Sequence, residues 1–336
     1  MKKQYLILGA TGSIGYGFTQ VLLEAGENVT ILVRDTGAAA RLFGQPGNLS
    51  IAEGDALDDR LLNQLAEGKD FIFHGISVPY DKWQAFMPDV TQKVIEAAKH
   101  ARAVLLFPGN NYNFGKVQMP ITELTPYNPS SRMGAVRVAL EQMLQTAARQ
   151  NQVKVIVLRM AEVWGPNVTN KGVAPIFENV LRGKPMPWLV RSDIPQQWVF
   201  NLDAGRALYE LSKRIPETNY TVYNYGGVTV PSIQSWFGQI ARQAGQPFRQ
   251  QVMPGWVITV LAWFVPFFRE LNGLLYKYQQ SILLDDQKFR AAFPGFENTP
   301  MADAIDMTLA WFKNRSAQSL DPATAKSREK AVGQAS

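Results

Sequence analysis

The sequence contains no cysteine and only two histidines, His74 and His100, among its 336 residues. Disulfides, thiolate nucleophiles and cysteine-ligated metals are therefore excluded, and so is a histidine-rich metal site. The formal net charge is +6, yet no run of five like charges occurs. Because a nucleic-acid-binding arm normally carries such a run, we expect no nucleic-acid partner, and we also expect no metal.

Long apolar segments are also missing. The apolar run Tyr5–Leu8 is too short for the hydrophobic region of a secretion signal. The apolar stretch Trp256–Phe268 is too short to span a bilayer about 30 Å thick. We therefore expect a cytoplasmic protein with no integral membrane segment.

The first half of the sequence alternates apolar runs with helical patterns. Helices are expected at Ile14–Ala25, Val90–His100 and Arg132–Gln150. Strands are expected at Tyr5–Leu8, Asn28–Val33, Leu49–Glu53, Phe71–Phe73, Ala103–Phe107 and Val153–Leu158. Fully apolar strands separated by helices predict an α/β fold in which a doubly wound parallel sheet of the Rossmann type is covered on both faces.

A glycine-rich turn lies between the first expected strand and the first expected helix. In such a turn the first glycine permits the tight bend, the second lets a diphosphate approach the backbone, and the third lets the helix pack on the strand. The diphosphate is then held by the free N–H groups and the dipole of the helix N-terminus. We predict that a dinucleotide cofactor contacts Gly9, Thr11, Gly12, Ser13, Ile14 and Gly15.

The second expected strand is followed by Arg34, where an acidic residue would accept a hydrogen bond from the ribose 2′-hydroxyl of NAD. Arginine suits a 2′-phosphate, so we predict NADP in preference to NAD. Two alternatives stay open: Arg34 is solvated, or Asp35 reaches the ribose. Asp55 and Ala56, after the third strand, are predicted beside the adenine, although Asp55 equally suits the capping of a turn.

The composition changes after Gly165-Pro166, where proline, tryptophan and glycine become frequent. Helices are expected at Asp203–Arg214, Ser232–Ala244 and Met301–Asn314. We predict a dinucleotide-binding domain at residues 1–165 and a smaller, mostly substrate-binding lobe at 166–315, part of which returns to the main sheet. Residues 316–336 lack aromatic side chains and are predicted to be a mobile tail.

Several segments in the correct order carry a family resemblance, namely Gly9–Gly15, Phe114-Gly115, Ile121–Pro126, Leu158-Arg159, Val163–Pro166, Asn201–Asp203 and Thr299–Phe312. They resemble the extended short-chain dehydrogenases/reductases, and in particular the NAD-dependent epimerase/dehydratase group of that family. The chain looks like an atypical member of it. The resemblance implies a hydride-transfer site with a Ser or Thr, a Tyr that transfers a proton, and a Lys four residues later on the same helix.

The three matching positions are occupied here by Asn110, Met133 and Arg137. Methionine has no transferable proton, and arginine is a poor acid or base at pH 7, although it can hold ribose hydroxyls. Asn110 can still donate a hydrogen bond to a carbonyl. Tyr112 follows the fifth strand, where this fold places substrate, and it is our candidate for the missing proton donor; the alternative is a packing tyrosine.

Further candidates come each with a plainer alternative. Tyr80, on a loop after the fourth expected strand, is a second candidate for the proton donor, and its alternative is again a packing tyrosine. Tyr80 and Trp198 are predicted to contact substrate. His74 is either a base or a hydrogen-bonded core residue. Arg159 and Glu162 form either a structural ion pair or a grip on an anionic substrate.

The aromatic stretch Trp256–Phe268 is expected to be a helix that lies in the core or covers the site. Its alternatives are a subunit interface, a site for a hydrophobic substrate, and peripheral contact with a membrane.

Two functions remain open at this point. The first is an NADP-dependent oxidoreductase or epimerase/dehydratase-like enzyme that acts on a small molecule. The second is a non-catalytic NADP-binding sensor, which the loss of the family's Tyr and Lys favours. The resemblance also implies a homodimer through the helices Val90–His100 and Arg132–Gln150.

Overall fold

The central sheet is parallel and doubly wound, as predicted. The computed structural model describes residues 2–79, 82–117, 119–214 and 216–319. Seven parallel strands follow the order β10-β6-β5-β4-β1-β2-β3. They are β1 (Gln4–Leu8), β2 (Asn28–Val33), β3 (Leu49–Glu53), β4 (Phe71–His74), β5 (Val104–Asn110), β6 (Lys154–Met160) and β10 (Tyr220–Tyr225). Strand order reverses between β1 and β4, and ligands bind at such a switch point.

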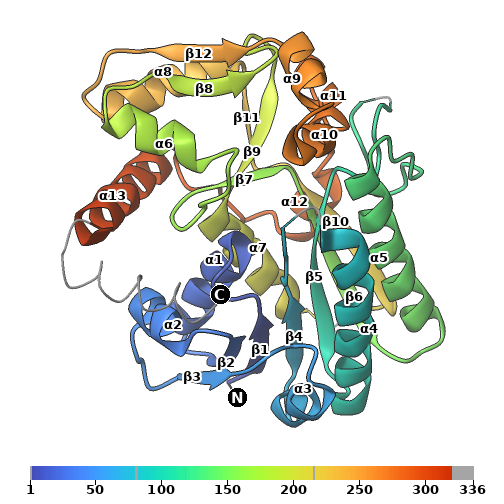
Figure 1. Cartoon of the computed structure of the whole chain (residues 1–336). Helices are drawn as coiled ribbons and strands as arrows, with labels where there is room; N and C mark the ends of the chain where they lie inside the picture. The colour runs from blue at the N-terminus through green and yellow to red at the C-terminus, as the bar shows by residue number, and fades with distance from the viewer. Residues whose placement is uncertain (1, 80–81, 118, 215, 320–336) are drawn as a thin grey trace.

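Helices cover both faces of this sheet (Figure 1). α1 and α7 pack together on one face, whereas α3, α4 and α5 lie side by side on the other. These helices and α2 have the bounds α1 (Ser13–Glu24), α2 (Thr36–Phe43), α3 (Asp59–Ala66), α4 (Trp83–Ala101), α5 (Arg132–Arg149) and α7 (Asn201–Ser212). Since strands and helices alternate up to β6, the loops at the carboxyl ends of β1, β4 and β5 meet at one edge.

Helices α2 and α3 were not expected from the sequence, although each is opened by an aspartate. Asp35 accepts a hydrogen bond from the backbone N–H of Ala38 at 2.8 Å. Asp58 accepts hydrogen bonds from the N–H groups of Arg60 and Leu61 at 3.0 and 3.1 Å. Aspartate at this position satisfies amides that a helix leaves without an internal partner. These caps were the signal that would have located both helices.

The C-terminal lobe has a core of its own. The helices and strands not yet given are β7 (Glu162–Trp164), α6 (Ala174–Leu181), β8 (Met186–Leu189), β9 (Gln196–Phe200), β11 (Val228–Val230), α8 (Ile233–Gln243), β12 (Gln250–Met253), α9 (Gly255–Leu261), α10 (Pro266–Asn272), α11 (Tyr276–Gln279), α12 (Gln287–Ala292) and α13 (Met301–Ser319). Trp164, Trp198 and Trp236 are buried together in this lobe. Trp198 is only 2% exposed, and its ring centroid lies 4.3 Å from that of Trp236. Trp198 is therefore packed in the core of the lobe.

The apolar stretch Trp256–Phe268 differs most from its prediction. Instead of one buried helix it forms α9 and α10, and the second helix starts at Pro266, a residue that suits the first turn and not a helix interior. Trp256 is 70%, Trp263 77% and Phe264 75% exposed. The expectation of a core helix is therefore wrong for these side chains.

The end of the chain was expected to be a mobile tail, and no segment was expected to span a membrane. Ser316–Ser319 form the last turn of α13, while the rest of the expected tail, residues 320–336, lies outside the described residues. None of the helices in the described ranges combines the length and the apolar character needed to cross a bilayer.

Candidate dinucleotide and proton-transfer site

The glycine-rich turn forms a cradle of backbone atoms at the carboxyl end of β1. Gly9 has a φ of +85°, in the left-handed region that other residues rarely adopt. A Cβ atom at Gly9 would lie 2.5 Å from the carbonyl oxygen of Gly75, and a Cβ at Gly15 would overlap the carbonyl oxygen of Gly9. Since three backbone segments approach this closely, only glycine fits at either position.

The first turn of α1 presents its amide groups to this cradle. The helix begins after Gly12, no side chain caps it, and no acidic residue lies in its first turn. Thr11 and Gly12 are exposed, while Ser13 and Ile14 are half-buried. A helix N-terminus with uncapped N–H groups beside an exposed turn suits a diphosphate. The residues present therefore fit the diphosphate of a dinucleotide.

At the end of β2, Arg34 is exposed, and so is the neighbouring Asp35. The carboxylate of Asp35 caps α2 through Ala38. After β3, the Oδ1 atom of Asp55 accepts a hydrogen bond from the N–H of Leu57 at 2.9 Å, so Asp55 caps a turn. Ala56 follows it and is half-buried. All three charged residues are thus exposed at the strand ends, and Asp35 and Asp55 each use one oxygen for capping.

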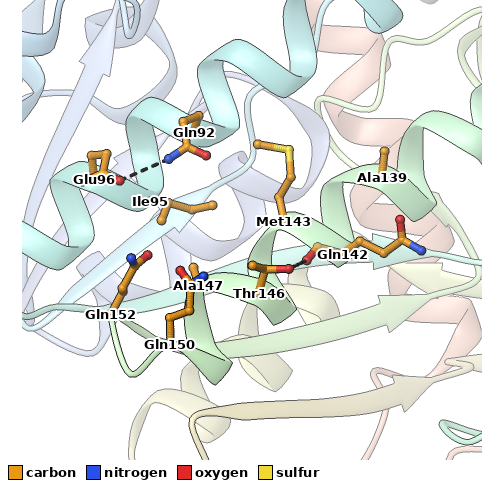
Figure 2. A pocket seen from close by; sticks show the side chains of 10 residues that line it. All are labelled: Gln92, Ile95, Glu96, Ala139, Gln142, Met143, Thr146, Ala147, Gln150 and Gln152. Carbon is orange, nitrogen blue, oxygen red and sulfur yellow. Dashed lines mark hydrogen bonds between the residues drawn. The ribbon is translucent and has the colours of Figure 1, made fainter.

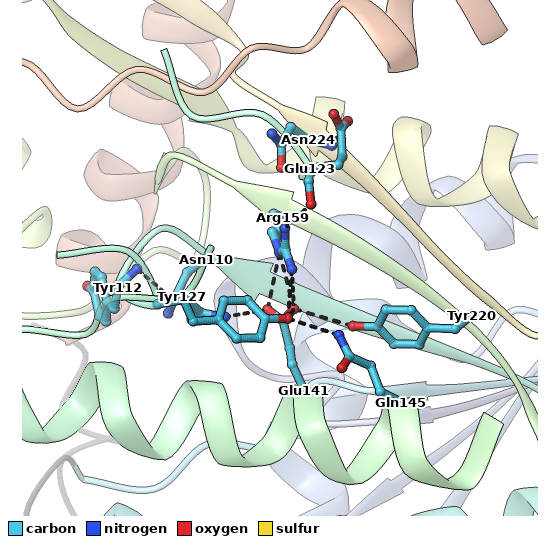
Figure 3. A network of polar contacts seen from close by, with 10 residues as sticks. Asn110, Tyr112, Glu123, Tyr127, Glu141, Gln145, Arg159, Tyr220 and Asn224 are labelled. Atoms are coloured by element: carbon cyan, nitrogen blue, oxygen red, sulfur yellow. Dashed lines mark hydrogen bonds and ion pairs between the residues drawn. The ribbon is translucent and has the colours of Figure 1, made fainter. Parts of the chain in front are cut away.

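Asn110 ends β5, and Tyr112 lies in the loop that follows. The Oδ1 atom of Asn110 accepts a hydrogen bond from the backbone N–H of Tyr112 at 3.0 Å (Figure 3). Asn110 is half-buried, and Tyr112 is 8% exposed. Tyr80, the other tyrosine predicted here, lies outside the described residues. Both described residues thus lie together at the edge of the sheet where the cradle also lies.

Met133 and Arg137 lie on α5, one turn apart. Met133 is 2% exposed and adds no polar atom to the site. The guanidinium of Arg137 lies 4.8 Å from the centroid of the Trp83 ring and donates a hydrogen bond to the carbonyl oxygen of Pro108 at 3.3 Å. Arg137 is therefore held between α4 and β5 in this structure.

Lys277, on α11, was missed by sequence analysis. Its Nζ atom lies 4.2 Å from the centroid of the Tyr112 ring and 2.7 Å from Oε2 of Glu162. The expected pairing of Arg159 with Glu162 is therefore wrong. Nothing in the sequence around Lys277 signals this contact, because it joins α11 to a loop far away in the chain.

Arg159 pairs instead with Glu141, a carboxylate buried beneath the loop after β5 (Figure 3). The Nη2 atom of Arg159 lies 2.6 Å from Oε2 of Glu141. Glu141 also accepts hydrogen bonds from Asn113 at 2.7 Å and from the Tyr127 hydroxyl at 2.8 Å. Burial, followed by the negative charge of Glu141, raises the pKa of Tyr127 to about 12. Through Asn113, this cluster fixes the loop that carries Tyr112.

His74 ends β4 and is 1% exposed. Its Nε2 atom is hydrogen-bonded to Oγ1 of Thr91 at 2.9 Å. Burial, with a smaller contribution from the charge of Arg137, lowers the pKa of His74 to about 3. These contacts favour the hydrogen-bonded core residue over the base.

Figure 2 shows a groove of about 500 Å³ between α4 and α5. Gln92 and Glu96 come from α4, and Gln142 and Met143 from α5. None of the predicted site residues lines it. The groove is thus separate from the cradle and the Tyr112 loop, and it lies between the two helices expected to form a dimer.

The doubly wound sheet and its glycine cradle define a dinucleotide-binding protein. A model of the NAD-dependent epimerase/dehydratase family matches residues 5–226. The chain therefore belongs to this family, within the extended short-chain dehydrogenases/reductases.

Characterised relatives and solved structures agree with this assignment. The chain is 24% identical over 286 residues to UDP-glucose 4-epimerase of Streptomyces lividans, covering 76% of this chain and 85% of that one. It is 32% identical to dTDP-glucose 4,6-dehydratase of Neisseria gonorrhoeae over 109 residues, which cover 32% of this chain and 30% of that one. The fold is similar to that of UDP-glucuronic acid 4-epimerase from Bacillus cereus in complex with NAD, with a TM-score of 0.76, 17% identity, and coverage of 93% and 99% of the two chains.

The buried neutral state of His74 predicts a specific acid sensitivity. The unfolded state takes up a proton at the ordinary pKa of about 6.5 and the folded state only near pH 3, so stability is lost as pH falls below about 6.5. Between pH 7.5 and 5.0 the loss attributable to His74 is about 2 kcal/mol. In denaturant unfolding, the free energy of unfolding of His74→Asn should fall by about 2 kcal/mol less between pH 7.5 and 5.0 than that of the unaltered protein.

The matched control is His100→Asn, because His100 is the other histidine and is exposed. This variant should lose as much stability on acidification as the unaltered protein. An equal loss in His74→Asn would mean that His74 already takes up its proton in the folded protein.

Proposed function

We propose that this chain is an NADP-dependent enzyme that interconverts a carbonyl and an alcohol on a nucleotide-linked sugar or a related small molecule. The observation that carries the proposal is the uncapped N-terminus of α1 above the Gly9–Gly15 cradle, which suits a diphosphate. The substrate class is supported by the epimerases and dehydratases among the relatives.

The bound cofactor supplies hydride transfer, and this chain's residues would position the reacting oxygen and its proton. In this scheme the cradle and α1 hold the diphosphate, and Arg34 holds the 2′-phosphate. Asn110 orients the substrate oxygen at the end of β5. Tyr112 provides the proton that Met133 cannot, a contribution typically worth roughly 10²–10⁴-fold in rate. As the family resemblance implies, a homodimer through α4 and α5 belongs to the same proposal.

Binding of NADPH and NADH to the purified protein, followed by cofactor fluorescence, tests the cradle. Gly12→Ala should weaken binding at least tenfold, because its Cβ, 3.3 Å from the Gly9 carbonyl oxygen, crowds the exposed turn where the diphosphate would lie. Gly47→Ala is the matched control, since a Cβ there meets nothing within 4 Å. If the unaltered protein associates with neither dinucleotide, the proposal fails.

Turnover is then followed through cofactor absorbance and product analysis with UDP- and dTDP-linked sugars, aldehydes and ketones. Interconversion of any of them supports the enzyme. Tight cofactor binding without turnover of the panel would instead favour the non-catalytic sensor.

Cofactor choice depends on Arg34. Arg34→Ala should weaken NADP binding at least tenfold and NAD binding less than twofold, because only NADP carries the 2′-phosphate that the guanidinium would hold. Arg149→Ala is the control, because Arg149 is an exposed arginine at the far end of α5. Equal weakening of both cofactors by Arg34→Ala would remove the phosphate assignment.

A further inference from the structure

Lys277 brings a cation to the face of Tyr112 from outside the central sheet. It is 9% exposed, and its ammonium lies 4.2 Å from the ring centroid. Glu162, at the start of β7, holds it through an ion pair of 2.7 Å. Because β7 directly follows β6 and α11 lies in the C-terminal lobe, the contact joins two distant parts of the chain at one tyrosine.

We propose that Lys277 and Glu162 are positioning residues that set the acidity of Tyr112, a role that rests on the function proposed above. The O–H bond of Tyr112 breaks, and its proton forms an O–H bond with the substrate oxygen as a hydride from the nicotinamide cofactor reaches the carbonyl carbon. The electron pair stays on the phenolate, which later regains a proton from water. The reverse reaction runs through the same phenolate.

The physical basis is electrostatic. An ammonium near a phenol favours the ionised ring, and a partly dry site strengthens this attraction relative to water. Arg137, the residue at the family's lysine position, is held instead by Trp83 and Pro108. Among the described residues, Lys277 from α11 contacts the Tyr112 ring, and its partner Glu162 from β7 carries a negative charge that opposes the effect of the ammonium.

The ionisation of Tyr112 can be measured without cofactor by NMR of ring-labelled tyrosine, with the resonance assigned through Tyr112→Phe. Lys277→Met should shift the midpoint of the Tyr112 titration at least one pH unit upward, because the phenolate loses the cation beside it. Glu162→Gln should shift this midpoint downward, because the negative charge that opposes the effect of the Lys277 ammonium is removed. Lys277→Arg should restore most of the shift.

Lys288→Met is the matched control, because the Lys288 ammonium lies 4.6 Å from the ring of a different tyrosine, Tyr223. It should leave Tyr112 unchanged. An unchanged midpoint in Lys277→Met, or shifts of the same sign in the Lys277 and Glu162 variants, would overturn the proposal. If Lys277→Met does not fold, Lys277→Gln answers the same question. Failure of cofactor binding would remove the proposed function without altering these titrations.

A second, independent observation is the aromatic ridge, which we define as Trp256, Val260, Trp263 and Phe264. These side chains are 70%, 48%, 77% and 75% exposed, and they project from α9 and the residues just after it. Single exposed hydrophobic residues are common, but four within nine positions form a patch that marks an interaction surface. Figure 1 shows α9 and α10 at the upper right edge of the molecule.

We infer that this ridge contacts an anionic lipid surface. The segment Pro247–Arg269 contains no acidic residue, whereas Arg249 and Arg269 are exposed within it. The whole chain has a net charge of +6. Tryptophan and phenylalanine beside arginine are the combination that short interfacial helices use to lie in the headgroup region. Since no described helix could span a bilayer, the contact would be peripheral.

Sedimentation with vesicles tests this surface. The protein should bind vesicles of mixed phosphatidylglycerol and phosphatidylcholine, and bind pure phosphatidylcholine at least tenfold more weakly. Combined substitution Trp256→Ser, Trp263→Ser and Phe264→Ser should abolish binding. Leu124→Ser, at a residue 92% exposed outside the ridge, should not.

Two results would overturn the lipid assignment. One is the absence of binding to anionic vesicles. The other is a concentration-dependent dimer that the triple variant alone abolishes, which would make the ridge a contact between copies of the chain.

Discussion

The buried carboxylate of Glu141 is the interaction on which the site's geometry depends. It receives hydrogen bonds from the loop after β5, from Tyr127, from Arg159 of β6 and, at 3.4 Å, from Tyr220 of β10. A buried charge is tolerated only when such partners surround it, so each of these segments is held at a fixed distance from α5. The loop that carries Tyr112 is thereby anchored through Asn113.

The chemistry of the site is divided between the two halves of the chain. The sheet supplies what can be built from local backbone, namely the glycine cradle and the free end of α1. The C-terminal lobe supplies the charge that contacts Tyr112, through Lys277. The family resemblance implies a tyrosine and a lysine on one helix, and here Met133 and Arg137 occupy those positions. The proposed proton donor and its cation thus come from separate elements.

Sequence alone located what depends on near neighbours. The turn Gly9–Gly15 and six of the seven strands of the main sheet were readable, because their signals lie within a few residues. The seventh strand, β10, was not located. Contacts between distant segments were not: Arg159 was paired with nearby Glu162, whereas its partner Glu141 lies on α5. In the aromatic ridge, a continuously apolar stretch does not reveal by periodicity which side meets solvent. The side chains of the aromatic ridge are exposed, whereas Trp198 is buried in the core of the lobe.

The late position of β10 has a consequence for synthesis on the ribosome. β6 ends at Met160, but its neighbour β10 begins only at Tyr220, after much of the lobe. At about 5–20 residues per second, the β6 edge stays uncovered for several seconds after it has been made. During that interval Glu141 lacks the Tyr220 hydroxyl, and the unpaired edge can join a strand of another nascent chain. The β6 edge is therefore most open to pairing with another chain between the completion of β6 and the arrival of β10.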